Sequence, residues 1–113
     1  VAGRWVQIGT TVHFTASFTF GAGSAVAGPV TVSLPAAMAA GTQNNHSSIH
    51  ATFFDTSATA FSIATCSYTT SSTYTLRATN AAGTYLTTTT VSSTIPFTWA
   101  TGDTITVSGT YEV

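Results

Sequence analysis

The stretch VHFTASFTF, residues 12–20, alternates apolar and polar side chains from its first residue to its last. Successive side chains of a β-strand point to opposite faces of the sheet, so an unbroken two-residue period is typical of a half-buried strand. Val12, Ala16 and the three phenylalanines fall on one face, and His13 falls on the other with threonine and serine. The stretch therefore predicts a strand with one apolar face and one polar face.

Further strands are expected along the rest of the chain, separated by clusters of Ser, Thr, Asn, Gly and Asp. The strand patterns cover residues 30–34, 49–54, 61–68, 73–79 and 85–93, and two short strands at 97–99 and 105–111 flank a turn at 100–103. The alanine-rich run at 36–40 allows one helical turn and no long helix. About eight strands without a repeat or a linker predict a single all-β domain over residues 1–113, an antiparallel β-sandwich of jelly-roll or Greek-key type.

Charge is the unusual feature of the composition. Only 4% of the 113 residues are charged, whereas about a quarter is usual. Two basic residues cannot neutralise a run of phosphates, which argues against a nucleic-acid partner. The chain also lacks a polybasic patch and a long apolar run, so we expect no membrane partner.

The shortage of charge also bears on assembly. Charged side chains normally keep the edge strands of different molecules apart. Here threonine and serine take the polar positions, and burying them between chains desolvates no charge. We therefore expect a homo-oligomer in which the exposed edges of the sandwich are covered.

Groups that could catalyse a reaction are scarce, at three carboxylates, three histidines and one thiol. A glycosidase needs a pair of carboxylates, and Asp55, Asp103 and Glu112 share no motif. Asp103 after Gly102 is typical of a turn, and the strand pattern around Cys66 predicts a buried, inert thiol. We therefore expect neither enzymatic activity nor a cofactor.

The three histidines and two tryptophans leave alternatives open. His46 and His50 have the spacing of a zinc pair on a helix, but the pattern puts them in a loop and at a strand start, so no metal site is predicted. The alternative is a metal bound on a symmetry axis of an oligomer, where the same histidine from each chain would be a ligand. Trp99 is interpreted as a core side chain, the alternative being a platform that stacks on a sugar. Trp5 is expected to pack against whatever precedes the domain, and His13 to be solvated or part of an interface.

Both ends of the chain resemble a known family. The opening segments GRWVQIG at 3–9 and FGAGS at 20–24, with the closing segments PFTWATGD at 96–103 and VSGTYE at 107–112, are similar to the C-terminal domains of minor tail proteins and tail fibres of tailed bacteriophages. The resemblance implies a C-terminal fragment of a longer protein, located in the virion and outside the cell. It implies a trimeric head at the distal end of a fibre, joined to other tail proteins through its N-terminal side.

By the same resemblance, the head recognises the host surface, typically a cell-wall saccharide bound in a shallow site near a protomer boundary. The matched segments look like scaffold, so we expect the contacts within 38–55 and 80–84. The candidate ligand-binding residues are Asn44, Asn45, His46, His50, Asp55 and Arg77. Three weak sites on one rigid trimer would act together and raise the overall affinity.

Two other functions fit the same sequence. A virion decoration or fibre-assembly domain would use the sandwich for protein contacts and never meet the receptor. A carbohydrate-binding module of a secreted protein would be attached to an enzyme, and the sequence on its N-terminal side would distinguish it from a fibre head.

Overall fold

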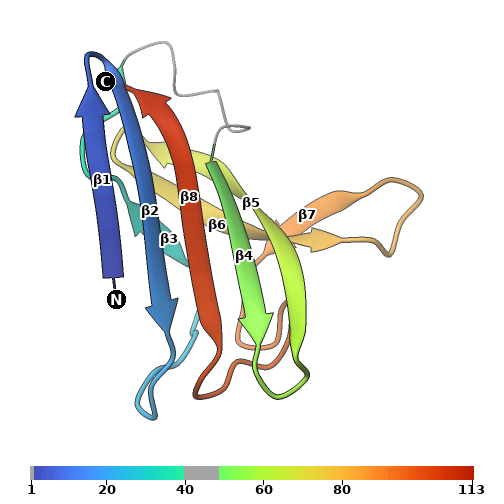
Figure 1. The fold of residues 1–113 in the computed structure, drawn as a ribbon. Coiled ribbons are helices and arrows are strands. Elements are labelled where there is room, and N and C mark those ends of the chain that lie inside the picture. The colour runs from blue at the N-terminus through green and yellow to red at the C-terminus, as the bar shows by residue number, and fades with distance from the viewer. Residues whose placement is uncertain (1, 40–48) are drawn as a thin grey trace.

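The structure is a computed structural model that describes residues 2–39 and 49–113. Eight β-strands and no helix lie in these two ranges (Figure 1). The strands are β1 Ala2–Ile8, β2 Thr11–Thr19, β3 Thr31–Ser33, β4 Ile49–Asp55, β5 Ala60–Thr70, β6 Thr73–Asn80, β7 Thr87–Thr90 and β8 Thr104–Glu112. No helix of this part of the chain could therefore cross a membrane.

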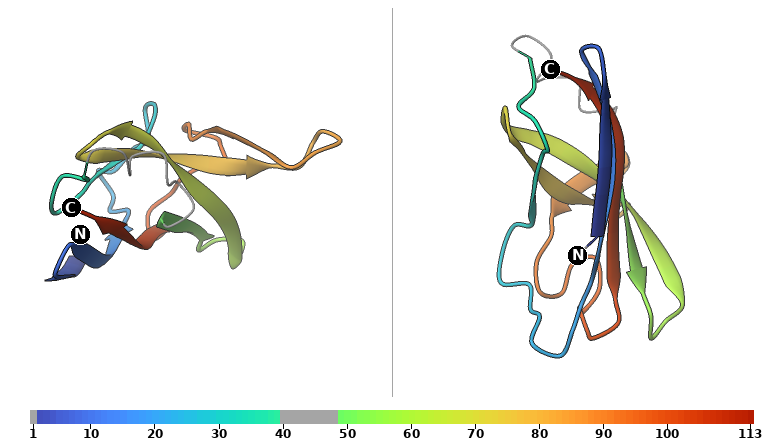
Figure 2. Two further views of the ribbon diagram at one scale, coloured as in Figure 1. Left: turned by 90° about the horizontal axis from the view of Figure 1, so that it is seen from above. Right: turned by 60° about the vertical axis from the view of Figure 1, so that its left-hand side comes forward.

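The strands form one antiparallel sheet in the order β1-β2-β8-β4-β5-β6-β3, and β7 also pairs with β6. The sheet curls into a half-barrel, so that β5 and β6 cross over the layer formed by β1, β2, β8 and β4 (Figure 2). We call the concave side of this half-barrel its inner face and the convex side its outer face. The free edge of β6 is divided, because β3 pairs along Thr73–Thr75 and β7 along Arg77–Asn80.

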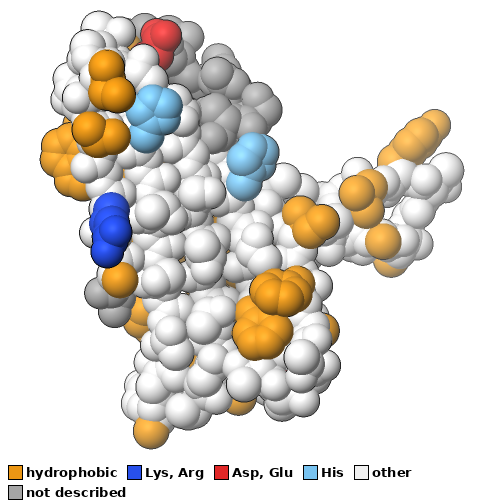
Figure 3. Space-filling view, in the orientation of Figure 1, with side chains coloured by type: hydrophobic (Ala, Val, Ile, Leu, Met, Phe, Trp, Pro, Cys, Tyr) orange, Lys and Arg blue, Asp and Glu red, His pale blue; other side chains and the backbone are white. Residues whose placement is uncertain are grey.

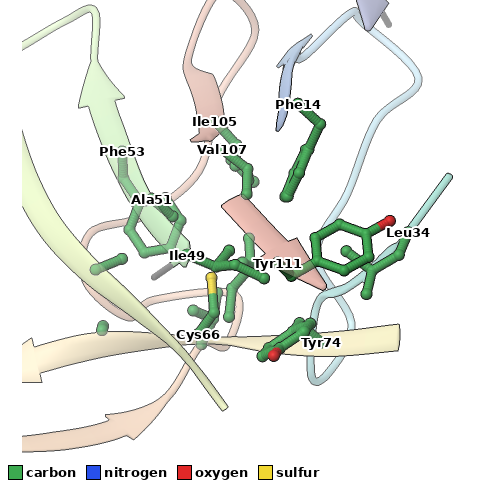
Figure 4. Close-up of a cluster of buried hydrophobic side chains, with 14 of the residues drawn as sticks. Phe14, Leu34, Ile49, Ala51, Phe53, Cys66, Tyr74, Ile105, Val107 and Tyr111 are labelled. Atoms are coloured by element: carbon green, nitrogen blue, oxygen red, sulfur yellow. The ribbon is translucent and has the colours of Figure 1, made fainter. Parts of the chain in front are cut away.

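The core lies on the inner face and follows from the two-residue alternation of the strands. In β2, Val12 and Phe14 are buried while His13 and Thr15 are exposed. The other strands supply the rest of a continuous cluster (Figure 4), including Ile49, Ala51, Phe53, Cys66, Tyr74, Leu76, Ile105, Val107 and Tyr111. Each large side chain buried in this way contributes roughly 1.5–3 kcal/mol through removal of apolar surface from water.

The segment from Leu34 to Ala39 is held against the core as a loop. The Tyr111 hydroxyl donates to the Ala36 carbonyl at 2.8 Å and accepts from the Ala36 N–H at 3.1 Å, and the Tyr74 hydroxyl donates to Met38 Sδ at 3.0 Å. These tertiary contacts use the backbone groups that a helical turn would need. No helical turn forms at 36–39, and the rest of the alanine-rich run and its polar tip lie outside the described residues.

The loop between β7 and β8 differs from the expected short strand at 97–99. Trp99 lies in this loop, where its Nε1–H donates to the Ser92 carbonyl at 3.1 Å and its ring stacks on Phe20 with centroids 4.9 Å apart. The indole also meets Phe53 edge-on at 5.3 Å. Trp99 is partly buried and packs against the core, in the direction of the prediction, although a loop and not a strand positions it.

The structure confirms an all-β, antiparallel fold of eight strands. It adds β1, which the strand patterns did not include, and it shortens the strand expected at 85–93 to four residues. β1 was missed because all seven of its residues are exposed, so burial imposes no alternation on it. The closed jelly-roll sandwich and the trimer stay predictions.

Beyond the body of the half-barrel, β6 and β7 form a projecting hairpin, visible at the right of Figure 1. The pairing of β5 with β6 reaches only as far as Ala64 and Ala78, so Thr79 and Asn80 pair with β7 alone. The connection at the tip carries Tyr85 and Leu86, which are 80% and 71% exposed. The hairpin therefore presents apolar side chains to solvent.

Candidate functional site

The register of the sheet lines up one side chain from each of seven strands on the outer face. From β1 to β7 this row is Arg4, Thr15, Ser108, His50, Thr65, Arg77 and Thr90. Directly paired residues of an antiparallel sheet project from the same face. This row of the outer face is therefore a band of hydroxyl side chains with an arginine near each end and a histidine between them.

A shallow depression of about 660 Å³ interrupts this band where β1, β2, β8 and the start of β4 run side by side. We call it the outer-face hollow. It is lined by Arg4, Trp5, Val6, His13, Phe14, Thr15, His50, Ser108, Gly109 and Thr110. Figure 3 shows this face, with a basic side chain over β1 and two histidines further across the sheet.

The polar groups of the outer-face hollow are positioned by the sheet itself. His13 lies opposite Thr110, and His13 Nδ1 is 3.0 Å from Thr110 Oγ1. In the neighbouring row, Ser108 lies between Thr15 and His50. Because these side chains stand on three central, paired strands, their hydroxyl and imidazole groups are held at fixed spacings of about 5 Å across the sheet.

The rim on the β1 side is apolar and basic. Val6 is 51% exposed and lies opposite His13, and Arg4 extends from the same strand. Trp5 contributes to the lining but lies opposite Phe14, so its indole projects toward the inner face. No carboxylate lines the hollow; Glu112 lies two residues beyond Thr110 on β8, opposite Thr11. The arrangement offers hydrogen-bond donors and acceptors, an apolar side chain and a positive charge to a ligand that stays largely in solvent.

Of the predicted ligand-binding residues, the structure describes His50, Asp55 and Arg77, and it places these three in different surroundings. Asn44, Asn45 and His46 lie outside the described residues. His50 lines the outer-face hollow.

Asp55 serves the turn after β4. Its Oδ1 accepts hydrogen bonds from the Ser57 hydroxyl at 2.7 Å, the Ser57 N–H at 3.0 Å and the Ala58 N–H at 3.1 Å. The bond from the Ser57 side chain, followed by that from the Ala58 backbone, lowers the pKa of the Asp55 carboxyl from its usual value.

Arg77 is used within the sheet. Its Nε donates to Thr88 Oγ1 at 3.0 Å, and its terminal nitrogens reach Thr90 Oγ1 at 3.5 Å and the Thr88 carbonyl at 3.4 Å. These contacts join β6 to β7 at the root of the projecting hairpin. Five strand steps separate Arg77 from Arg4, or about 24 Å along the sheet.

Reasoning from the sequence did not select Arg4, Thr15, Ser108 or Thr110 as site residues. Arg4 lies in β1, a strand that was not predicted. Ser108 and Thr110 lie in β8, which is far from β2 in the sequence, so the pairing of β2 with β8 cannot be inferred from local patterns. One signal was present: a short β1–β2 connection at Gly9, which has a positive φ of 61°, brings Arg4 opposite Thr15.

A second hollow, of about 640 Å³, lies on the inner face and is apolar. Phe18, Val30 and Val32 line it together with Leu76 and Val107. The hollow forms because the half-barrel does not close between β2 and β3, which are not paired with each other. It exposes part of the core and offers few polar groups to orient a ligand.

The remaining reactive groups do not form a site. Cys66 is buried, and desolvation raises the pKa of its thiol to about 11, so the thiol is protonated near neutral pH and is a weak nucleophile. Over residues 2–39 and 49–113, no three His, Cys, Asp or Glu side chains come together as a metal site would require. Comparisons of the chain with family models, with curated proteins and with solved structures give no match.

Proposed function

We propose that this chain is the head domain of a bacteriophage tail fibre or minor tail protein, a homotrimeric adhesin that binds a saccharide of the host cell surface. The outer-face hollow is the observation that supports the binding of a saccharide. The phage context comes from the resemblance of the chain's two ends to tail-protein domains. The protein would act in the virion, outside the cell, and contact other tail proteins through its N-terminal side.

The groups of the outer-face hollow suit a sugar. Thr15, Ser108 and Thr110 provide hydroxyls that both donate and accept, and His50 adds an imidazole. A depression this shallow buries little of its ligand, so a single site binds weakly and three sites on one particle are needed for adhesion.

The edge of β1 supports self-association. This strand pairs only with β2, and Trp5, Val6 and Ile8 are all more than half exposed. It has no lysine, no proline and one arginine, so it lacks the usual features that prevent edge pairing. We propose that β1 and its apolar side chains form the trimer contact, which would set the outer-face hollow beside a protomer boundary.

We also propose that the curled sheet works as a jelly-roll-type sandwich, with β1, β2, β8 and β4 facing β5, β6 and β3. The buried side chains of both layers meet in one core, as in a sandwich. The trimer would cover the open side between β2 and β3.

Cell binding tests the function. The fluorescently labelled domain should bind host cells of the phage and should be displaced by purified cell-wall saccharide. Substituting Ser108→Ala, which removes a hydroxyl from the outer-face hollow, should weaken binding several-fold, whereas Ser57→Ala in the β4–β5 turn should not. Binding to no cell wall, together with a stable monomer at micromolar concentration in light scattering, would rule out the proposal.

One observation favours a second function, a virion decoration or fibre-assembly domain that does not meet the receptor. Besides β1, the hairpin tip exposes Tyr85 and Leu86, and β5 exposes Phe61 and Ile63 at 72% and 75%. Exposed apolar side chains at three places are typical of protein contacts. Labelled domain that binds only to other virion proteins, and not to cells, would favour this function. A carbohydrate-binding module of a secreted protein would instead bind saccharide as a monomer.

A further inference from the structure

We propose that the outer-face hollow binds an acidic saccharide and that the Arg4 guanidinium holds the sugar's anionic group. This inference rests on the proposed function, because it names the class of saccharide that the same site takes. It goes further in assigning one residue to one chemical group of the ligand.

The two arginines of the chain are in opposite situations. Arg77 donates hydrogen bonds to Thr88 and Thr90 within the sheet. Arg4 makes no hydrogen bond or ion pair with any residue of the described ranges, and it lies at the rim of the outer-face hollow. Its five N–H donors are therefore free for a ligand.

The chain's own carboxylates do not compete for Arg4. Asp55 accepts three hydrogen bonds in its own turn, and the buried Asp103 accepts from Thr56 and Ala100. Glu112 is on β8, two strands from β1 and opposite Thr11. In a protein with two basic side chains, a free guanidinium among hydroxyls selects for a negative charge on the ligand.

The charge complementarity extends across the hollow. His13 and His50 stand on β2 and β4, on either side of β8. Neutral or protonated, an imidazole can donate a hydrogen bond to an anionic oxygen. Arg4 and the two histidines thus surround Thr15 and Ser108, whose hydroxyls suit the neutral part of a sugar. A carboxylate of a uronic acid and a phosphate on a sugar or polyol polymer both have the required chemistry, since each accepts two parallel bonds from a guanidinium.

Calorimetric titration of the whole domain with three probes tests the inference. The probes are an oligogalacturonate, a poly(glycerol phosphate) and a neutral dextran oligosaccharide of matched length. We expect at least one acidic probe to bind about tenfold more tightly than dextran, the usual effect of one charge-assisted hydrogen bond. The acidic probe that binds better distinguishes a carboxylate from a phosphate.

Two matched substitutions locate the anion. Arg4→Gln should lower affinity for the preferred acidic probe about tenfold and leave dextran binding unchanged, and Arg4→Lys should restore part of the loss. Arg77→Gln removes the same net charge from the other end of the row and should leave both affinities unchanged. Thermal unfolding of each variant establishes that the fold is kept.

Three results would overturn the inference. If dextran binds as tightly as the acidic probes and Arg4→Gln has no effect, the site takes a neutral sugar and the proposed function stands without this inference. If Arg77→Gln and not Arg4→Gln abolishes acidic binding, the anion is held elsewhere. If no saccharide binds at all, both the inference and the proposed function fail.

Discussion

Asp103 ties three loops together at the end of the half-barrel. Its carboxylate is 1% exposed and accepts from the Thr56 N–H at 2.9 Å and the Ala100 N–H at 2.7 Å. Its backbone carbonyl accepts from the Phe20 N–H at 2.9 Å. The prediction that this residue serves a turn is confirmed, with Gly102 supplying a φ of 95° beside it.

Replacing this carboxylate should be costly. Asp103→Ala leaves two backbone N–H groups without their charged acceptor, and we expect the free energy of unfolding to fall by about 3 kcal/mol. Urea denaturation followed by tryptophan fluorescence measures the change. Glu112→Gln, at an exposed carboxylate, is the matched control and should change stability by less than about 0.5 kcal/mol. Equal losses in the two variants would contradict the role of Asp103.

Asp55 makes stability depend on pH. Because hydrogen bonds in its turn lower the pKa of the folded carboxyl, the ionised form stabilises the fold above the unfolded pKa, and this contribution is lost as pH falls through the folded pKa. The difference in urea midpoint between the natural chain and Asp55→Ala should therefore be larger at about pH 7 than at about pH 2.5. A difference that grew on acidification would contradict this assignment.

The Cys66 thiol should not react with thiol reagents in the folded state. Burial raises the pKa of its thiol to about 11, so only about one molecule in a thousand carries the thiolate at pH 8. Ellman's reagent should label the folded protein hardly at all and label it fully in guanidinium chloride. Rapid labelling without denaturant would mean that β5 opens easily.

Among the elements, β1 is the one to which we assign the proposed trimer contact. All seven residues of this strand are exposed, although the strand is fully paired with β2 along one edge. The body of the core lies under the strands that follow it, so β1 contributes to the edge of the sheet more than to the burial of apolar surface.

If β1 forms the proposed trimer contact, a charge on this strand should separate the protomers while each of them stays folded. Ile8→Lys places an ammonium group at a position that is 66% exposed, and we expect the proposed trimer to dissociate to monomers. Analytical ultracentrifugation measures the mass, and circular dichroism follows the fold. Ala58→Lys, in the exposed turn after β4, adds the same charge at the other end of the molecule and should leave the mass unchanged. A trimer that persists in Ile8→Lys would place the contact elsewhere.

In the molecule as a whole, packing and hydrogen bonds must supply nearly all of the stability. The chain carries five ionised side chains besides its histidines, and no ion pair joins two residues of the described ranges. Salt acts on folding mainly by screening charges, and here few charges can be screened.

The stability of the domain should accordingly change little with ionic strength. We expect the urea midpoint at about 0.05 M sodium chloride to match that at about 0.5 M within experimental error. The binding of an acidic saccharide should weaken over the same range, because that contact is electrostatic. A midpoint that moved strongly with salt would reveal a network of charges that the fold does not contain.

Sequence patterns predicted the β-strands where burial imposes alternation. The stretch 12–20 forms β2 as expected, and the strand expected at 105–111 forms within β8, because each strand buries one face and only a two-residue period does this. The same reasoning missed β1, whose residues are all exposed, and it assigned Trp99 to a strand although its contacts hold it in a loop. The packing of Trp99 against the core was nevertheless predicted, since its indole has a large apolar surface to bury.

Composition and alternation thus decided the fold class, the shortage of charge and the small stock of reactive groups, because these are properties of local sequence. Tertiary pairing alone decided that Arg4, Thr15, Ser108 and His50 lie in one row on the outer face, since they belong to four strands and to distant parts of the chain. It also engaged Asp55 in a turn and Arg77 in the sheet, while Arg4 was left free. The shortage of charge was visible in the sequence, but which of two arginines could meet a ligand depended on hydrogen bonds that only the folded sheet makes.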